Sequence, residues 1–268
     1  MIERNPAGAA ALDDLPTVAA ISIAAVMTGP VIHEAFGHGL TCLALGGHVT
    51  QLSSVYFDCT PSSRLVAAMG PSLQFCAVAL FLGLAKAARG VAAPRMFVFL
   101  ILAAAFNGLW ASGYFVYSGL LDVGDWAVVF RQTMPASWLW RVPSVLMGAW
   151  LYVWLLGLLA RRLTALFAQD SPADGARIQR FIAIAYVSAG LASLLAVVGA
   201  RTGIARTLIE AAQESFLAGA GLIAVPRLMA RYPAPNVAGQ LAIERSWLWI
   251  ALAGLAFVIF ALTLGRGI

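Results

Sequence analysis

Long apolar stretches constrain this chain more than any other feature of its sequence. A helix needs roughly 20 apolar residues to cross the hydrocarbon layer of a bilayer, and six or seven stretches approach or exceed that length. They cover Pro16–Leu45, Leu65–Ala85, Met96–Gly119, Val142–Leu159, Phe181–Ala200, Thr207–Val225 and Trp247–Leu264. Of the 268 residues, 61% are apolar and only 11% are charged, too few charges for the surface of a soluble domain. We therefore predict an all-α polytopic membrane protein in a lipid bilayer.

The positive charges indicate how the chain is oriented. Sixteen of the 17 basic residues are arginines that occur singly or in pairs, which fits membrane orientation and not nucleic-acid binding. If all seven stretches span, one side of the membrane receives eleven basic residues and the other receives six. The larger set is Arg4, Lys86, Arg89, Arg95, Arg161, Arg162, Arg177, Arg180, Arg227, Arg231 and Arg245. Cytoplasmic loops carry the excess of positive charge, so we expect a cytoplasmic N-terminus in a bacterial-type inner or plasma membrane.

Three connecting segments are polar. Gly47–Ser63 (GHVTQLSSVYFDCTPSS) is rich in Val, Thr, Tyr and Phe, which predicts a short β-insertion after the first span. Ala168–Arg180 and Arg231–Gly239 predict loops. The chain has three cysteines and no CxxC pair, so we expect neither a disulfide framework nor a zinc ribbon.

Two histidines and a glutamate lie within the first apolar stretch, in the sequence GPVIHEAFGHGL. Ionisable residues at that depth are energetically costly and mark a functional site by default. His33 and His38 carry nitrogen ligands suited to zinc, and the Glu34 carboxylate can act as general base on metal-bound water. The alternative is that the three side chains pair among themselves as structural groups.

The spacing HExxxH differs by one residue from the HExxH pattern that places two histidines on one helix face. A five-residue step on a regular α-helix turns two side chains about 140° apart. Binding of one ion by His33 and His38 therefore requires a π-turn between them, and Gly37 would lower the strain of such a turn.

A zinc site needs a third protein ligand and one open position. The segment after the third span offers two carboxylates, Asp122 and Asp125. Asp125 is the first choice because Gly124 permits an unusual backbone conformation before it. Asp122 and His48 remain alternatives, since either carboxylate can be a solvated loop residue and His48 follows His38 beyond a Gly turn.

The run HEAFGHGLTCLALGGHV resembles the zinc-binding helix of the site-2 protease family of intramembrane zinc metalloproteases, where an HExxH helix runs into a Gly turn and a β-insertion. The following RLVAAMGPSLQFCAVALFLG is similar to the family's next helix, which contains a Gly-Pro pair, here Gly70-Pro71. Asn107 and the region around Asp125 correspond more weakly to an Asn and a ligand Asp of the family. The resemblance covers residues 16–126 and departs from the family in HExxxH and in VGDW, which replaces a Pro-rich Asp-Gly signature.

The resemblance implies a zinc metalloprotease that cleaves transmembrane or membrane-associated protein substrates near a membrane boundary. Residues 1–130 would form the metal-binding membrane core, and residues 131–268 would add helices to the same membrane domain. The β-insertion would offer an edge for strand addition to an unwound substrate. The implied roles are zinc ligands at His33, His38 and Asp125 and a general base at Glu34. Gln74 and Asn107 are candidate substrate-binding side chains.

Other polar residues in apolar surroundings leave two rival functions open. Glu210 and Glu214 share one helix face and can line a polar cavity or relay protons, or else lie in the headgroup layer beside Arg206. Gln74 can contact substrate but more readily cross-links helices. The rivals are a proton-coupled transporter that uses these glutamates and a non-proteolytic metal-binding protein of the same fold.

Overall fold

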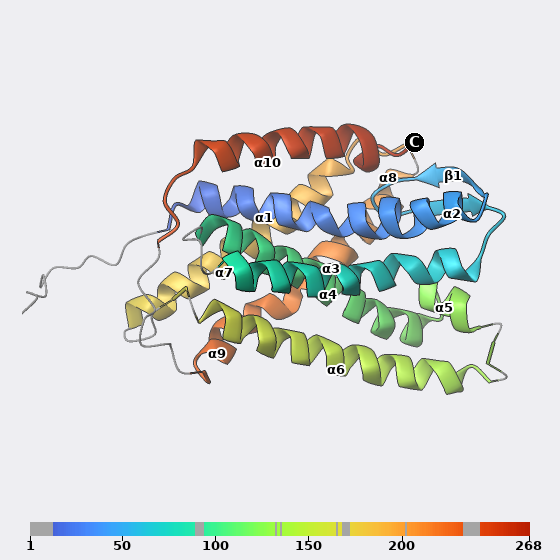
Figure 1. The fold of residues 1–268 in the computed structure, drawn as a ribbon, viewed down its shortest axis with the longest axis horizontal. Coiled ribbons are helices and arrows are strands. Elements are labelled where there is room, and N and C mark those ends of the chain that lie inside the picture. The colour runs from blue at the N-terminus through green and yellow to red at the C-terminus, as the bar shows by residue number, and fades with distance from the viewer. Residues whose placement is uncertain are drawn as a thin grey trace, which may run out of the picture.

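The computed structural model describes residues 13–88, 94–131, 133–134, 136–164, 166–167, 172–201, 203–232 and 242–268. Within these ranges seven helical segments are long and apolar enough to cross a membrane, and the chain is an all-α polytopic membrane protein. The segments are Leu15–Ala44, Arg64–Ala88, Pro94–Leu121, Trp138–Leu163, Asp174–Ala196, Ile204–Met229 and Trp247–Gly265. Figure 1 shows them running along one common direction, with the β-strands at one end of the bundle.

The first span is continuous but changes its helix type in the middle. It consists of α1 (Leu15–Pro30), the π-helix η1 (Val31–Gly39) and α2 (Leu40–Ala44). Asp14 caps the start, because its Oδ1 accepts a hydrogen bond from the backbone N–H of Thr17 at 3.0 Å. Pro16 lies in the first turn of α1, where a backbone N–H would have no acceptor within the helix, so the N–H that proline lacks is not needed there.

A β-hairpin follows the first span, as the sequence predicts. Strand β1 (His48–Leu52) pairs antiparallel with β2 (Phe57–Thr60), and a register irregularity interrupts the ladder between Val49 and Gln51. Leu52 also exchanges backbone hydrogen bonds with Ile268, which attaches the end of the chain to β1.

A disulfide joins Cys42 in α2 to Cys59 in β2, a pairing that the number and spacing of the cysteines did not predict. The hairpin folds β2 back beside α2 and brings together two cysteines that are 17 positions apart. Of the three cysteines, Cys76 alone remains a thiol.

Helix α4 (Pro94–Leu121) forms the centre of the bundle and is the most buried span. Helix α3 (Arg64–Ala88) packs against both η1 and α4, and the short helix α5 (Asp125–Phe130) follows α4 at the hairpin end (Figure 1). A Cβ added at Gly37 of η1 would lie 2.6 Å from the Cα of Gly70 in α3. Glycine at both positions therefore allows η1 and α3 to touch through their backbones.

The second half of the chain surrounds this centre. Helix α6 (Trp138–Leu163) packs on α4, and α7 (Pro172–Ala196) packs on α1. The sixth span comprises α8 (Ile204–Ala212), η3 (Gln213–Leu217), η4 (Ala220–Ala224) and α9 (Val225–Met229). The last span comprises α10 (Trp247–Phe260) and η5 (Ala261–Gly265). One continuous hydrophobic core includes residues from Val18 to Phe260, so both halves contribute to it.

The predicted loop Ala168–Arg180 is wrong over its second part, because α7 already begins at Pro172. Arg177 in this polar segment forms a buried ion pair with Asp13 (Nη2–Oδ1 2.8 Å). This pairing satisfies the charges and lets the first turns of α7 join the bundle. Residues 168–171 and 233–239 of the two predicted loops lie outside the described residues.

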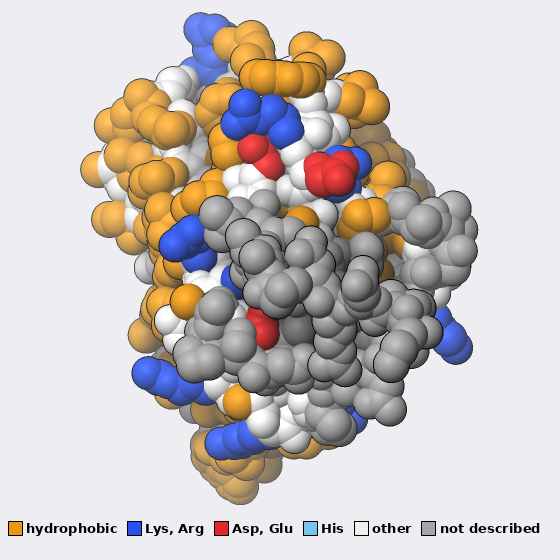
Figure 2. Space-filling model, turned by 90° about the vertical axis from the view of Figure 1, so that its left-hand side faces the viewer, with side chains coloured by type: hydrophobic (Ala, Val, Ile, Leu, Met, Phe, Trp, Pro, Cys, Tyr) orange, Lys and Arg blue, Asp and Glu red, His pale blue; other side chains and the backbone are white. Residues whose placement is uncertain are grey.

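The outer surface of the bundle is apolar, as a lipid-facing surface must be. Large hydrophobic side chains of α6 and α10, such as Trp150, Val153, Leu252 and Leu255, are half-exposed or more. Figure 2 shows the end of the bundle opposite the hairpin, where Lys and Arg side chains lie around the rim and hydrophobic side chains cover the flanks.

Candidate metal centre

The π-helix brings both histidines of the first span to one face. Every residue from Val31 to Gly39 is in π-helical conformation, which confirms the turn that the HExxxH spacing requires. The imidazole rings of His33 and His38 lie edge to face with their centroids 4.7 Å apart. Both side chains are buried.

Asp125 joins the two histidines from the start of α5. Its Oδ2 lies 3.0 Å from His33 Nε2 and 3.3 Å from His38 Nε2. Gly124 at φ +79° turns the chain so that α5 begins at this carboxylate, as the sequence predicts for a glycine there. Burial alone would raise the pKa of Asp125, but hydrogen bonds from His33 and His38 outweigh it and lower the pKa to about 2.

The remaining ring nitrogens are held by acceptors. His33 Nδ1 lies 2.9 Å from Gln74 Oε1, and His38 Nδ1 lies 2.7 Å from the carbonyl oxygen of Val66. A carbonyl oxygen can only accept, so each Nδ1 donates, and each Nε2 is directed toward Asp125. Metal-binding histidines in proteins are oriented in this way.

Two of the three distances between the donor atoms match those expected around a zinc ion. The ligand atoms of His33, His38 and Asp125 all lie within 4.8 Å of one another. Tetrahedral zinc with bonds of about 2.0 to 2.1 Å places its ligand atoms roughly 3.3 Å apart, and the two nitrogen-to-oxygen distances of 3.0 and 3.3 Å agree with that spacing. Two imidazoles and one carboxylate are also a donor set that zinc prefers in hydrolytic enzymes.

The two rings are fixed by close neighbours. Trp110 stacks on His33 at 4.8 Å, and Phe57 of β2 stacks on His38 at 5.3 Å. A Cβ added at Gly70 would lie 2.5 Å from His38 Nε2 and 2.8 Å from His33 Nε2. Glycine at position 70 therefore leaves the space that the ring nitrogens occupy.

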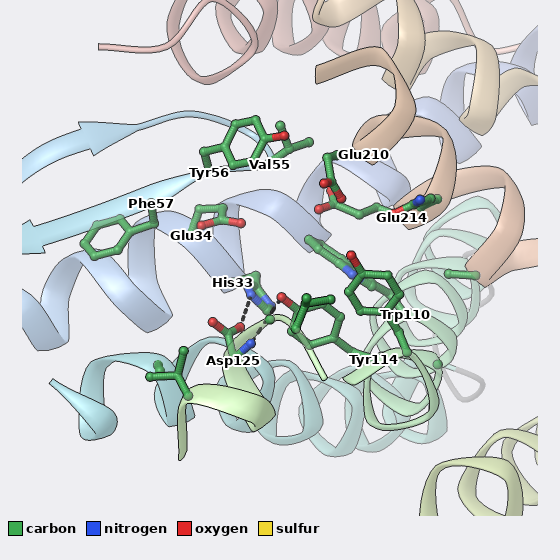
Figure 3. A pocket seen from close by; sticks show the side chains of 18 of the residues that line it. His33, Glu34, Val55, Tyr56, Phe57, Trp110, Tyr114, Asp125, Glu210 and Glu214 are labelled. Carbon is green, nitrogen blue, oxygen red and sulfur yellow. Dashed lines mark hydrogen bonds and ion pairs between the residues drawn. The ribbon is translucent and has the colours of Figure 1, made fainter. Parts of the chain in front are cut away.

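A cavity of about 900 Å³ opens beside the three side chains and includes Glu34 in its wall. Figure 3 shows Glu34 between His33 and the hairpin. The hairpin, α3, α4, α5, α6 and the sixth span contribute to the rest of the wall, and most of the lining side chains are apolar or aromatic. A carboxylate adjacent to the histidine cluster is positioned to handle a proton of water admitted through this cavity.

Glu210 and Glu214 also line the cavity, from the sixth span. Figure 3 shows them on the side away from Asp125. Their neighbours in the wall include Arg206, whose guanidinium lies 4.8 Å above the ring of Tyr56. The cavity therefore has two acidic regions, one at the histidine cluster and one on the sixth span.

The other residues that sequence reasoning selected lie outside the cluster. Asp122 pairs with Arg131 (Oδ1–Nη2 3.1 Å), and His48 is exposed at the start of β1. Asn107 donates from Nδ2 to Thr28 Oγ1 at 2.8 Å, a contact between α4 and α1. Neither Asn107 nor Gln74 belongs to the cavity wall, so their contacts are those of helix cross-linking and, for Gln74, of orienting His33.

The contacts of the cluster that sequence reasoning missed include those of Val66 and Tyr114. The carbonyl of Val66 gives no side-chain signal, because any residue there would supply it. Tyr114 lines the cavity with its ring centroid 5.7 Å from that of His33. It occurs among several aromatic residues in WASGYFVY, and only its position about two helical turns before Asp122 could have distinguished it. Compared with known protein families, curated proteins and solved structures, the chain has no match.

Proposed function

We propose that this protein is a membrane-embedded zinc peptidase that hydrolyses transmembrane or membrane-associated protein substrates. The observation that carries the proposal is the π-helix, which aligns His33 and His38 with Asp125 while Glu34 lines the adjoining cavity. The resemblance of HEAFGHGL to the site-2 protease family supports the same reaction class. A zinc ion held by the three side chains would polarise a carbonyl group and lower the pKa of water.

Glu34 has the central role in the proposed reaction. Its carboxylate takes a proton from water while the water oxygen bonds to the carbonyl carbon of the scissile peptide. The protonated carboxyl group then gives that proton to the amide nitrogen as the C–N bond breaks. The products are a carboxylic acid and an amine, the acid proton passes to the amine to give a carboxylate and an ammonium group, and Glu34 returns to its starting state.

The shape of the cavity supports an extended peptide as substrate. Phe57, Asp58 and Cys59 of β2 belong to its wall. β2 pairs with β1 along one edge, and the described residues contain no strand on its other edge. A substrate segment unwound from its helix can add there as a further strand, with backbone hydrogen bonds that replace those of the helix.

We infer that the hairpin end of the bundle faces an oxidising compartment. Two independent observations support this orientation. The Cys42–Cys59 disulfide lies at the hairpin end, and disulfides persist in oxidising surroundings. The described members of the larger set of basic residues lie toward the opposite end, among them Lys86 at the end of α3 and Arg161 at the end of α6. Cleavage would then occur toward the outer face of the membrane, with the N-terminus in the cytoplasm.

The test of the proposal is peptide cleavage by purified protein in liposomes that contain synthetic transmembrane peptides of different sequence. Mass spectrometry of the products should reveal new termini with wild-type protein. Glu34→Gln should retain zinc and lower the cleavage rate by about 10² to 10⁴. Glu244→Gln is the matched control, because Glu244 is 84% exposed and lies before α10. Undiminished cleavage by Glu34→Gln would contradict the proposal.

A proton-coupled transporter is the second candidate, and the position of Glu210 and Glu214 in the cavity wall is the observation that favours it. Solute or proton flux into liposomes that is lost in Glu210→Gln and Glu214→Gln, and is unaffected by chelators, would support transport over hydrolysis. Retained zinc without any cleavage by wild-type protein would instead favour a non-proteolytic metal-binding protein.

A further inference from the structure

Tyr114 lies where a reacting carbonyl oxygen would need a hydrogen-bond donor. Its ring contacts His33 edge to face, and its hydroxyl oxygen accepts a long hydrogen bond of 3.4 Å from the backbone N–H of Asp125. Figure 3 shows the hydroxyl directed from α4 toward Asp125. The side chain thus touches two of the three candidate zinc ligands and also lines the cavity.

The hydroxyl hydrogen of Tyr114 has no acceptor among the described residues, because its one recorded hydrogen bond is received from Asp125. The donor capacity of the hydroxyl therefore remains available to a molecule in the cavity. The neighbouring backbone makes room for it. A Cβ at Gly124 would lie 2.7 Å from Tyr114 Oη, so glycine before Asp125 accommodates this hydroxyl as well as the turn.

Another tyrosine hydroxyl of the cavity wall is already used in the fold. Tyr152 Oη donates to the carbonyl of Ala218 at 2.7 Å and accepts from the N–H of Gly221 at 2.9 Å. Tyr56 lies beneath the guanidinium of Arg206, on the hairpin side of the cavity. Tyr114 alone among the described wall hydroxyls is recorded in contact with the ligand cluster.

We propose that Tyr114 is a catalytic residue that donates a hydrogen bond to the oxyanion formed from the scissile carbonyl. This inference rests on the proposed peptidase function. As the water oxygen bonds to the carbonyl carbon, the C=O π electrons move to oxygen, and the Tyr114 O–H stabilises that negative charge without transferring its proton. When the C–N bond breaks, the carbonyl re-forms and the hydrogen bond weakens. Donors at this position stabilise the transition state more than the bound substrate.

The test is Tyr114→Phe, which removes the hydroxyl and keeps the ring against His33. Three quantities are measured on purified protein: zinc content, affinity for acetohydroxamate by calorimetry, and kcat and KM for a transmembrane peptide that wild-type protein cleaves. Acetohydroxamate is a small zinc-chelating anion whose oxygens take the place of the reacting oxygens. Tyr232→Phe is the matched control, since Tyr232 follows α9 at the far end of the bundle.

Tyr114→Phe should keep its zinc, bind acetohydroxamate about 10- to 100-fold more weakly and lose about 10² to 10³ in kcat with KM little changed. Tyr232→Phe should match wild-type protein in all three. Unchanged acetohydroxamate affinity would overturn the inference, and so would a loss of zinc, which would make Tyr114 a support for Asp125. If wild-type protein binds acetohydroxamate but cleaves no peptide, the proposed function fails while the hydroxyl's donor role is still measured.

Discussion

Replacing Gly70 by alanine is expected to displace the histidine rings, although it changes none of the candidate ligand residues. The added methyl carbon would lie 2.4 Å from His38 Cε1 and 2.5 Å from His38 Nε2. The distance between the added carbon and His38 Nε2 must therefore increase from 2.5 Å to at least 3.4 Å, which is ordinary contact, so the ring must move by about 0.9 Å. Zinc-ligand distances tolerate only about 0.2 Å. Phe57 also stacks on the His38 ring, which restricts the movement of that ring.

The expected consequence is a loss of zinc affinity of at least 100-fold, which corresponds to about 2.8 kcal/mol. Overpacking at a backbone contact also costs about 1 to 3 kcal/mol of stability. Zinc affinity is measured by competition with a chromophoric chelator in detergent solution, and stability by the thermal unfolding midpoint of the zinc-free protein.

The matched control is Gly83→Ala, on the same helix α3, where an added Cβ meets no atom within 4 Å. It should bind zinc as wild-type protein does and be as stable or slightly more stable, because alanine favours the helix by up to about 1 kcal/mol over glycine. Wild-type zinc affinity in Gly70→Ala would refute the reasoning, since it would mean that the two ring nitrogens do not form the metal site in this geometry.

Two further predictions concern groups around the cluster. Gln74→Leu should lower zinc affinity about 10- to 100-fold, because His33 Nδ1 loses its acceptor. Gln74→Glu keeps an acceptor oxygen and should bind zinc more tightly than Gln74→Leu. Equal zinc affinity in the two variants would contradict the role of Gln74 as acceptor for His33. Cys42→Ser should lower the free energy of unfolding by about 3 kcal/mol, because it opens a loop of 17 positions. Denaturant unfolding in detergent measures this loss, and the same treatment with a reductant should lower wild-type stability equally and leave the variant unchanged.

The membrane fold is largely predictable from sequence, because length and apolarity alone decide whether a helix can span. The first span shows this well: the predicted segment Pro16–Leu45 and the observed Leu15–Ala44 differ by one residue at each end. Its π-helix is predictable for a chemical reason, since His33 and His38 can meet at one ion only through such a turn. The start of α7 is not predictable, because Arg177 joins the bundle through its ion pair with Asp13, a residue far away in the sequence.

Contacts between distant segments account for what the sequence leaves open in the candidate site. Sequence reasoning ranks Asp125 over Asp122 because Gly124 precedes Asp125. The structure adds that Asp122 pairs with Arg131. The disulfide depends on the register of the hairpin over α2, which no local pattern encodes. Tyr114 approaches Asp125 because α5 turns back toward α4, where Trp126 stacks on Phe115 at 4.3 Å.

The zinc K-edge absorption spectrum of purified wild-type protein tests the central claim most directly. It should show about one zinc per chain with two imidazole nitrogens and further nitrogen or oxygen ligands at about 2.0 to 2.1 Å. His33→Ala, His38→Ala and Asp125→Ala should each remove the bound zinc, and Glu34→Gln should leave the spectrum with the same histidine scattering. Absence of zinc, or a sulfur shell at about 2.3 Å, would contradict the site.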